Sequence, residues 1–173
     1  MRIIGITGWS GAGKTTLILK LIPLLTARGL KVSTLKHAHH MFDVDTPGKD
    51  SYEHRAAGAS EVLIASQNRF AIMHELRGAP EPPLEVLLSK LSAVDLVLIE
   101  GFKRAPHPKI EVFRAANGKL PLYPAGAAII GIASDAAITQ AACPVLALDD
   151  APAIVAFCLA QAVAPSAVNW REG

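Results

Sequence analysis

The 173-residue sequence has few cysteines, no excess of one charge and no long apolar run. Its two cysteines, Cys143 and Cys158, are too few to staple a fold of this size, which argues against a disulfide-rich secreted framework. Lys and Arg number 17 against 15 Asp and Glu, with no cationic run, so we expect no binding to nucleic acid. The longest apolar tract, Ala151 to Pro165, is shorter than the ~18 residues of a membrane span, and the N-terminus does not resemble a signal peptide. These absences predict a soluble cytoplasmic protein that does not bind membranes.

The sequence is rich in hydrophobic residues. Hydrophobic residues make up 51% of the chain and charged residues 18%, which is too apolar for a disordered protein and enough to fill a core. At ~100–200 residues per domain, the length predicts one globular domain over residues 1–173. The residues after Val163 carry no motif, and we expect them to form a loose tail.

Apolar runs alternate with helical patterns along the chain. Strands are expected over residues 2–7, 31–36, 94–99, 109–114 and 127–133, and helices over residues 14–29, 51–57 (with Asp50 as cap), 82–91 and 149–163. Two further strand-like runs, 61–66 and 69–75, are separated by two residues and predict an antiparallel hairpin. Strand–helix alternation predicts an α/β three-layer sandwich around a mainly parallel sheet.

The segment from Gly8 to Thr15, GWSGAGKT, matches the phosphate-loop pattern G-x-x-x-x-G-K-[ST] without a mismatch. Glycines let successive backbone N–H groups converge on phosphate oxygens, where a Cβ would obstruct them. Lys14 can reach the β/γ-phosphates, and the Thr15 hydroxyl can bind Mg²⁺. An apolar strand precedes the loop and an amphipathic helix follows it. The N-terminal end of that helix is expected to face the bound phosphate. The sequence therefore predicts a nucleoside triphosphate site in a P-loop NTPase fold.

Several carboxylates follow expected strands and are candidates to complete that site. Glu100 ends a buried strand and precedes Gly101, which suits the second carboxylate of a phosphate site; a solvated strand terminus explains it as well. Asp43 and Asp45 leave the same edge of the sheet as the phosphate loop, where they could hold Mg²⁺ through water or position the attacking water. The turn around Gly48 could order on a γ-phosphate, as switch loops do.

Three histidines, His37, His39 and His40, occupy the segment before these acids. Imidazole suits Zn, Ni or Cu, but no cysteine accompanies them. Three interpretations remain: a contact to nucleotide or partner, delivery of a transition metal, and surface histidines without a function.

Base recognition has one candidate, the pair Ser134 and Asp135 at the end of a late strand. An Asp carboxylate accepts from both guanine N1–H and N2–H₂, a pair of donors that adenine does not offer. A helix N-cap role explains Asp135 equally well.

Six segments occur here in one order: WSGAGKTT, KHAHH, DVDTPGKDS, a hairpin around ASQNR, IEGFK and IASD. Together they resemble the bacterial molybdopterin-guanine dinucleotide biosynthesis adapter family, MobB, from Met1 to about Ala160. The resemblance implies a homodimeric GTP-binding protein with Mg²⁺ as cofactor and at most a slow GTPase activity. Its implied role is to assist the molybdenum cofactor guanylyltransferase, which joins GMP to Mo-molybdopterin. Whether molybdopterin itself touches this chain stays open.

The resemblance also assigns roles residue by residue. Lys14, Asp43 and Asp45 would be the catalytic group, and Thr15 with Glu100 would hold Mg²⁺. Many related metallocentre-assembly GTPases carry a Lys after the first glycine of the loop, but this chain has Trp9, so a lysine crossing to a partner's nucleotide is not supported there. The phosphate contacts implied are Ser10, Gly11, Ala12, Gly13, Lys14, Thr15 and Thr16. From their positions in the chain, Ser134 and Asp135 are expected near guanine, and Gly48 is expected to contact the nucleotide at its γ-phosphate.

Two other functions use the same motifs. A small-molecule kinase would move a phosphoryl group from the same loop to an acceptor, but the chain has no evident Arg-bearing lid insertion. A nickel or zinc metallochaperone GTPase would use His37, His39 and His40, and it would bind those ions tightly and stoichiometrically.

Overall fold

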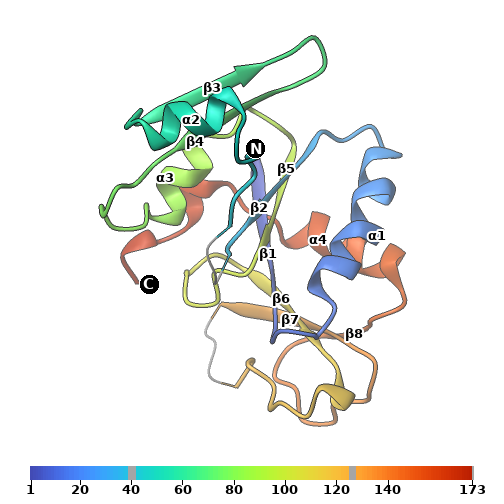
Figure 1. Cartoon of the computed structure of the whole chain (residues 1–173). Coiled ribbons are helices and arrows are strands. Elements are labelled where there is room, and N and C mark those ends of the chain that lie inside the picture. Colours follow the sequence, from blue (N-terminus) through green and yellow to red (C-terminus); the bar gives the residue numbers. More distant parts are fainter. Residues whose placement is uncertain (39–41, 125–127, 173) are drawn as a thin grey trace. The chain divides into compact units, whose positions relative to one another are not determined.

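The computed structural model describes residues 1–38, 42–124 and 128–172, and contacts divide the chain into two compact units. The first unit contains Met1–His37 and Leu84–Gly173, and the second contains Ala38–Pro83 (Figure 1). The single nucleotide-binding domain over residues 1–173 stays a prediction.

The first unit is built on a six-stranded sheet in which every neighbouring pair is parallel. Strand β1 lies inside the sheet with β5 and β6 as its neighbours, in the order β2-β5-β1-β6-β7-β8. The loop after β1 therefore leaves from the middle of the carboxyl edge, where ligands bind in sheets of this kind. The strands are β1 (Arg2–Thr7), β2 (Val32–Lys36), β5 (Leu96–Glu100), β6 (Lys109–Phe113), β7 (Ile129–Ser134) and β8 (Val145–Ala147).

Helices cover both faces of this sheet and give the predicted three-layer sandwich (Figure 1). Neighbouring β1 residues point to opposite faces. Ile4 lies in the larger core with α1 (Lys14–Thr26) and α4 (Ala151–Gln161), whereas Ile3 lies in the smaller core with α3 (Leu84–Ser89). The α/β fold with a mainly parallel sheet is confirmed. Strand β8 was not expected, because it is short and two of its three residues are exposed.

Two helix starts differ from the prediction. Asp50 does not cap α2 (Asp50–Ala56) but is its first residue, and the N-cap, Lys49, makes no side-chain cap hydrogen bond. Helix α4 begins at Ala151 because Asp150 is its cap, with a carboxylate that accepts from the Ala153 N–H at 2.9 Å. Neither α4 nor another helix in the described part of the chain is long and apolar enough to cross a membrane.

The end of the chain does not form the loose tail that was expected. Val163 and Ile3 exchange two backbone hydrogen bonds, at 2.7 and 3.2 Å. Two short 3₁₀ helices follow, η2 (Pro165–Ala167) and η3 (Trp170–Glu172), and Trp170 packs against the core beside α3. The C-terminal segment is held in place by the burial of its apolar side chains. No sequence motif predicts this packing.

The second unit combines α2 with the predicted antiparallel hairpin, which is confirmed as β3 (Glu61–Ala65) and β4 (Phe70–His74). Val62 pairs with Met73, and both side chains are buried on one face of the hairpin. The opposite face is exposed and carries apolar side chains beside the hydrogen-bonded Glu61 and His74. Its large exposed apolar side chains are Leu63, Phe70 and Ile72, at 58–68%.

Two titratable side chains are buried beside the sheet of the first unit. Burial lowers the pKa of His107 to about 3, so its ring is neutral, and neither ring nitrogen has a hydrogen-bond partner among the described residues. A Cβ on Gly5 would stand 2.5 Å from the His107 ring, so only glycine fits beside it. Burial also lowers the pKa of Lys109, to about 8, and its ammonium donates to the Ala105 carbonyl.

Candidate functional site

The phosphate loop connects β1 to α1 and depends on three left-handed glycines. Gly8, Gly11 and Gly13 have φ of 137°, 81° and 94°, which side chains other than glycine rarely adopt. A Cβ on Gly8 would also stand 2.5 Å from the Val112 carbonyl oxygen of the neighbouring strand. Gly13 is the N-cap of α1, and no side chain makes a capping hydrogen bond there. The first backbone N–H groups of α1 are therefore available to an anion bound in the loop.

Lys14 folds across this loop. Its ammonium donates to the carbonyl oxygens of Gly8, at 3.0 Å, and Trp9, at 2.9 Å. Burial lowers the pKa of Lys14, and the nearby Glu100 carboxylate opposes that shift. Phosphate oxygens carry charge and make stronger hydrogen bonds than these neutral carbonyls. A phosphate in the loop would therefore draw the ammonium away from them.

Thr15 and Glu100 meet, as expected if both belong to one site. The Thr15 hydroxyl donates to Glu100 Oε1 at 2.8 Å and keeps lone pairs for a cation. Lys36 Nζ, from the strand paired with β5, lies 3.5 Å from the same carboxylate oxygen. Hydroxyl and carboxylate oxygens are the donors that Mg²⁺ takes, so these residues fit that ion. The metal role itself stays a prediction.

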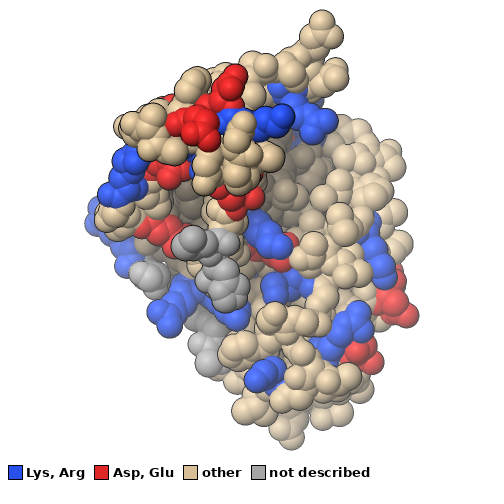
Figure 2. All heavy atoms as spheres, viewed as in Figure 1, with Lys and Arg blue, Asp and Glu red and all other residues tan. Residues whose placement is uncertain are grey.

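Trp9 forms an aromatic side of the loop. Its indole N–H donates to the Leu120 carbonyl at 2.8 Å, and Lys103 Nζ stands 4.4 Å from the ring centroid, a cation–π geometry. Lys103 and Lys36 both act electrostatically on Lys14, so cations surround the loop. Figure 2 shows that cationic and acidic side chains are interspersed over the face of the molecule that it draws.

The segment after β6 holds the phosphate loop from outside. Arg114 Nε donates to the Ala12 carbonyl oxygen at 3.1 Å. Asn117, the last residue of the 3₁₀ helix η1 (Ala115–Asn117), donates from Nδ2 to the Ser10 carbonyl oxygen at 3.0 Å. Neither side chain was predicted to belong to the site, because they are part of no sequence motif. The one available signal was their place at the end of the expected strand, residues 109–114, and just beyond it.

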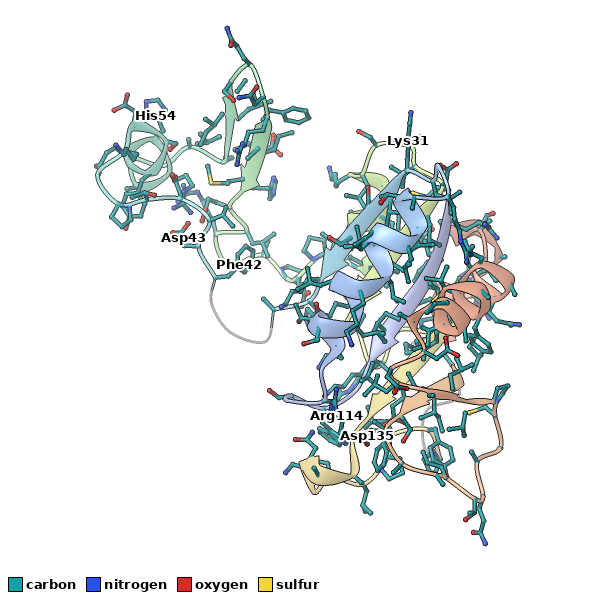
Figure 3. All side chains as sticks on the ribbon, turned by 90° about the vertical axis from the view of Figure 1, so that its right-hand side faces the viewer. Lys31, Phe42, Asp43, His54, Arg114 and Asp135 are labelled. Carbon is teal, nitrogen blue, oxygen red and sulfur yellow. The ribbon has the colours of Figure 1, made fainter. Side chains whose placement is uncertain are left out.

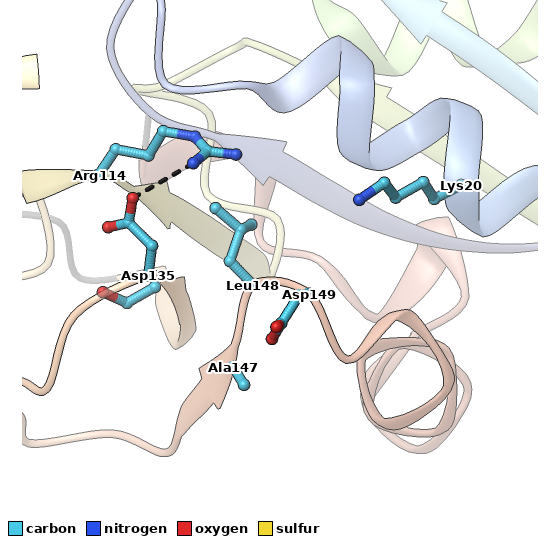
Figure 4. Close-up of a pocket in the computed structure, with 7 residues that line it drawn as sticks. Lys20, Arg114, Asp135, Ala147, Leu148 and Asp149 are labelled. Carbon is cyan, nitrogen blue, oxygen red and sulfur yellow. Dashed lines mark hydrogen bonds and ion pairs between the residues drawn. The ribbon is translucent and has the colours of Figure 1, made fainter. Parts of the chain in front are cut away.

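A pocket of about 240 Å³ lies near the phosphate loop, at the carboxyl ends of β7 and β8 (Figure 4). Sites that enclose a whole drug-sized ligand measure ~300–1,000 Å³, so this pocket suits one part of a nucleotide. Its lining residues include Lys20, Arg114, Ser134, Asp135, Leu148 and Asp149.

Asp135 is part of the pocket lining and does not cap a helix. Its Oδ2 accepts from Arg114 Nη1 at 3.2 Å (Figures 3 and 4). Its Oδ1 accepts from the Ala115 N–H at 3.2 Å. Ser134 makes a local turn, with an Oγ that donates to the Ala136 carbonyl and accepts from the Ala136 N–H. The N-cap interpretation is wrong because no helix begins directly after Asp135; the next helix in the described residues is α4, which begins at Ala151.

The remaining predicted acids lie in the second unit, where they surround Arg55. The guanidinium makes ion pairs with Asp43 at 2.8 Å, Asp45 at 3.3 Å and Glu75 at 2.9 Å. Its hydrogen bonds lower the pKa of Asp43. Gly48 lies in the turn before α2 with φ of 81°. The catalytic roles of Asp43 and Asp45 and the nucleotide contact of Gly48 stay predictions.

The histidine cluster is described only in part. The His37 backbone N–H donates to the Glu100 carbonyl at 2.9 Å, and its ring centroid lies 4.6 Å from that of Phe102. His39 and His40 lie outside the described residues. Within those residues, the structure holds no group of three His, Cys, Asp or Glu side chains arranged for a metal ion.

Comparisons with known proteins agree on one family. Residues 3–135 match the model of MobB, molybdopterin guanine dinucleotide synthesis protein B. The molybdopterin-guanine dinucleotide biosynthesis adapter protein of Escherichia coli K12 is 49% identical over 121 residues, 69% of each chain. Its counterpart in Haemophilus influenzae is 50% identical over 115 residues, 65% of this chain and 63% of that one. The crystal structure of Bacillus subtilis MobB superposes with a TM-score of 0.71 at 27% identity, covering 93% of this chain and 98% of that one.

Proposed function

Because the chain belongs to the MobB family of molybdopterin guanine dinucleotide synthesis proteins, we propose that it is a cytoplasmic GTP-binding adapter of this biosynthesis. In this role it assists the molybdenum cofactor guanylyltransferase that joins GMP to Mo-molybdopterin. The observation that carries the nucleotide-binding part is the phosphate loop, where Lys14 and the Thr15–Glu100 pair stand beside the uncapped start of α1.

Different residues of the loop would bind different parts of a nucleoside triphosphate. Backbone N–H groups from Ser10 to Thr16 donate to phosphate oxygens, and Lys14 neutralises the terminal phosphates. Thr15 and Glu100, joined by a hydrogen bond, would hold Mg²⁺ through their hydroxyl and carboxylate oxygens. The ion, when bound, neutralises negative charge on the phosphates. Ser134 and Asp135 place the base, with the Asp135 carboxylate on guanine N1–H and N2–H₂.

Hydrolysis is proposed to be slow. Asp43 and Asp45 are the proposed water-positioning acids, and each already makes an ion pair with Arg55. The hydrogen bonds from Arg55 lower the pKa of Asp43, which makes that carboxylate a weak proton acceptor. A function that rests on binding, with little turnover, suits an adapter.

Equilibrium binding of a fluorescent GTP analogue with Mg²⁺, competed separately by GTP and ATP, tests this function. We expect GTP to displace the analogue at least about tenfold better than ATP, because only guanine offers two donors to Asp135. A second arm mixes the chain with the guanylyltransferase, with and without GTP, and we expect GTP to change their co-elution. Equal competition by ATP contradicts the guanine assignment, and absence of any association contradicts the adapter role.

A second copy of this chain is the proposed occupant of the exposed hairpin face. Leu63 and Ile72 pair across the strands and, with Phe70, leave an apolar surface on the second unit. Isolated two-stranded hairpins are marginally stable and gain from burying such a face. We expect Ile72→Asp to convert a dimer into a monomer in sedimentation equilibrium. The matched control Leu19→Asp, at an equally exposed apolar residue of α1, leaves the dimer intact. A dimer that persists in Ile72→Asp contradicts this interface.

A further inference from the structure

We propose that Arg114 is a positioning residue that couples base recognition to phosphate binding. The inference rests on the proposed function, since it concerns the same nucleotide site. One guanidinium makes both contacts: Nε donates to the Ala12 carbonyl oxygen in the phosphate loop, and Nη1 donates to the Asp135 carboxylate at the pocket. Figure 4 shows this side chain reaching Asp135 across the edge of the pocket.

On the phosphate side, Arg114 controls the direction of a peptide group. A trans peptide points its C=O and N–H in opposite directions. When Arg114 holds the Ala12 carbonyl outward, the Gly13 N–H of the same peptide turns into the loop, toward the phosphates. The guanidinium also lies against Gly13, where a Cβ would stand 3.3 Å from Nε.

Asn117 provides the same kind of control at one other peptide. It holds the Ser10 carbonyl at 3.0 Å, which turns the Gly11 N–H inward. Among the described residues, the Asn117 side chain donates only to the loop, whereas Arg114 also reaches the pocket. The two side chains therefore allow the two effects to be separated.

On the base side, Arg114 orients the Asp135 carboxylate. A carboxylate offers about four lone-pair directions, of which Arg114 and the Ala115 N–H use one each. The others remain for the two guanine donors. The side chains of Arg114 and Asp135 are 41% and 35% exposed, so a ligand can reach the pair.

Three variants separate the two effects in one assay with three probes: GTP, ATP and inorganic tripolyphosphate. We expect Arg114→Ala to lower tripolyphosphate affinity about tenfold and to lower the GTP-to-ATP affinity ratio about tenfold as well. Asn117→Ala lowers the affinity for all three probes and leaves the ratio unchanged. Asp135→Asn lowers the ratio and leaves tripolyphosphate binding unchanged.

Arg28→Ala, at an exposed arginine after α1, is the matched control and changes neither quantity. Arg114→Lys keeps the charge but donates from a single nitrogen atom, which cannot replace Nε and Nη1 at two separated acceptors, so we expect it to fold and to recover one of the two effects at most. If Arg114→Ala or, should it fail to fold, Arg114→Lys keeps both tripolyphosphate affinity and the ratio, the coupling is overturned. A wild-type protein without GTP preference contradicts the proposed function instead, while tripolyphosphate binding still reports on the loop contact.

Discussion

The Lys14→Ala variant is expected to lose GTP affinity by about 100-fold or more, because charge-assisted hydrogen bonds are worth roughly 1.5–3 kcal/mol each and the ammonium makes more than one. Lys14 already lies over the loop, bonded to two of its carbonyls, and the binding site therefore needs little rearrangement to engage phosphate. Titration of a fluorescent GTP analogue with Mg²⁺ measures the loss.

Lys31→Ala is the matched control for this experiment, since Lys31 is an exposed lysine of the same unit. We expect it to bind as the wild type does. Lys14→Ala should fold normally, because removing a partly buried ammonium also removes its desolvation cost. Circular dichroism and thermal unfolding check this. Retained affinity in a folded Lys14→Ala protein would falsify the phosphate-loop assignment.

The Asp135→Asn variant is expected to exchange its preferred base. An amide presents one acceptor and one donor, so it loses a hydrogen bond to guanine and gains one to the C2 carbonyl of xanthine. We expect GTP affinity to fall about 100-fold and XTP to become the better competitor, because a site built around specific hydrogen bonds discriminates strongly. Competition of the fluorescent analogue by GTP and XTP measures the exchange.

Asp149→Asn serves as the control, because Asp149 lines the same pocket but no hydrogen bond joins it to Arg114 among the described contacts. We expect this variant to keep the GTP preference. If Asp135→Asn leaves both affinities unchanged, the base does not contact Asp135. If Asp149→Asn changes the preference instead, the specificity carboxylate is the one after β8.

The Lys14→Ala and Asp135→Asn variants probe opposite ends of the nucleotide, and their effects on GTP affinity are expected to be close to additive. Lys14 and Asp135 contact different atoms of the nucleotide in the proposed complex, and separated sites usually add. Arg114 touches both regions, so its substitution combined with Asp135→Asn should cost less GTP preference than the sum. Such a double-mutant cycle extends the test of the coupling.

Local sequence signals were sufficient for the elements and for the phosphate loop. The glycines, Lys14 and Thr15 lie within eight consecutive residues, so their spacing alone carries the backbone geometry. Strand and helix periodicity predicted the parallel sheet, and two residues between apolar runs predicted the hairpin. The boundaries shifted where a side chain decided them, as when Asp150 capped α4 in place of an earlier start.

By itself, the sequence determined the fold class, the family and the residues that line the phosphate loop, because these depend on neighbours along the chain. Only the tertiary structure decided that Arg114 and Asn117 hold the loop, since they lie 102 and 107 residues away from their partners Ala12 and Ser10. The order of strands in the sheet is also decided by tertiary structure. Strand β5 lies between β2 and β1, which brings Glu100 to Thr15. Contacts between distant segments are chosen by packing and hydrogen-bond satisfaction across the whole fold, which local patterns do not encode.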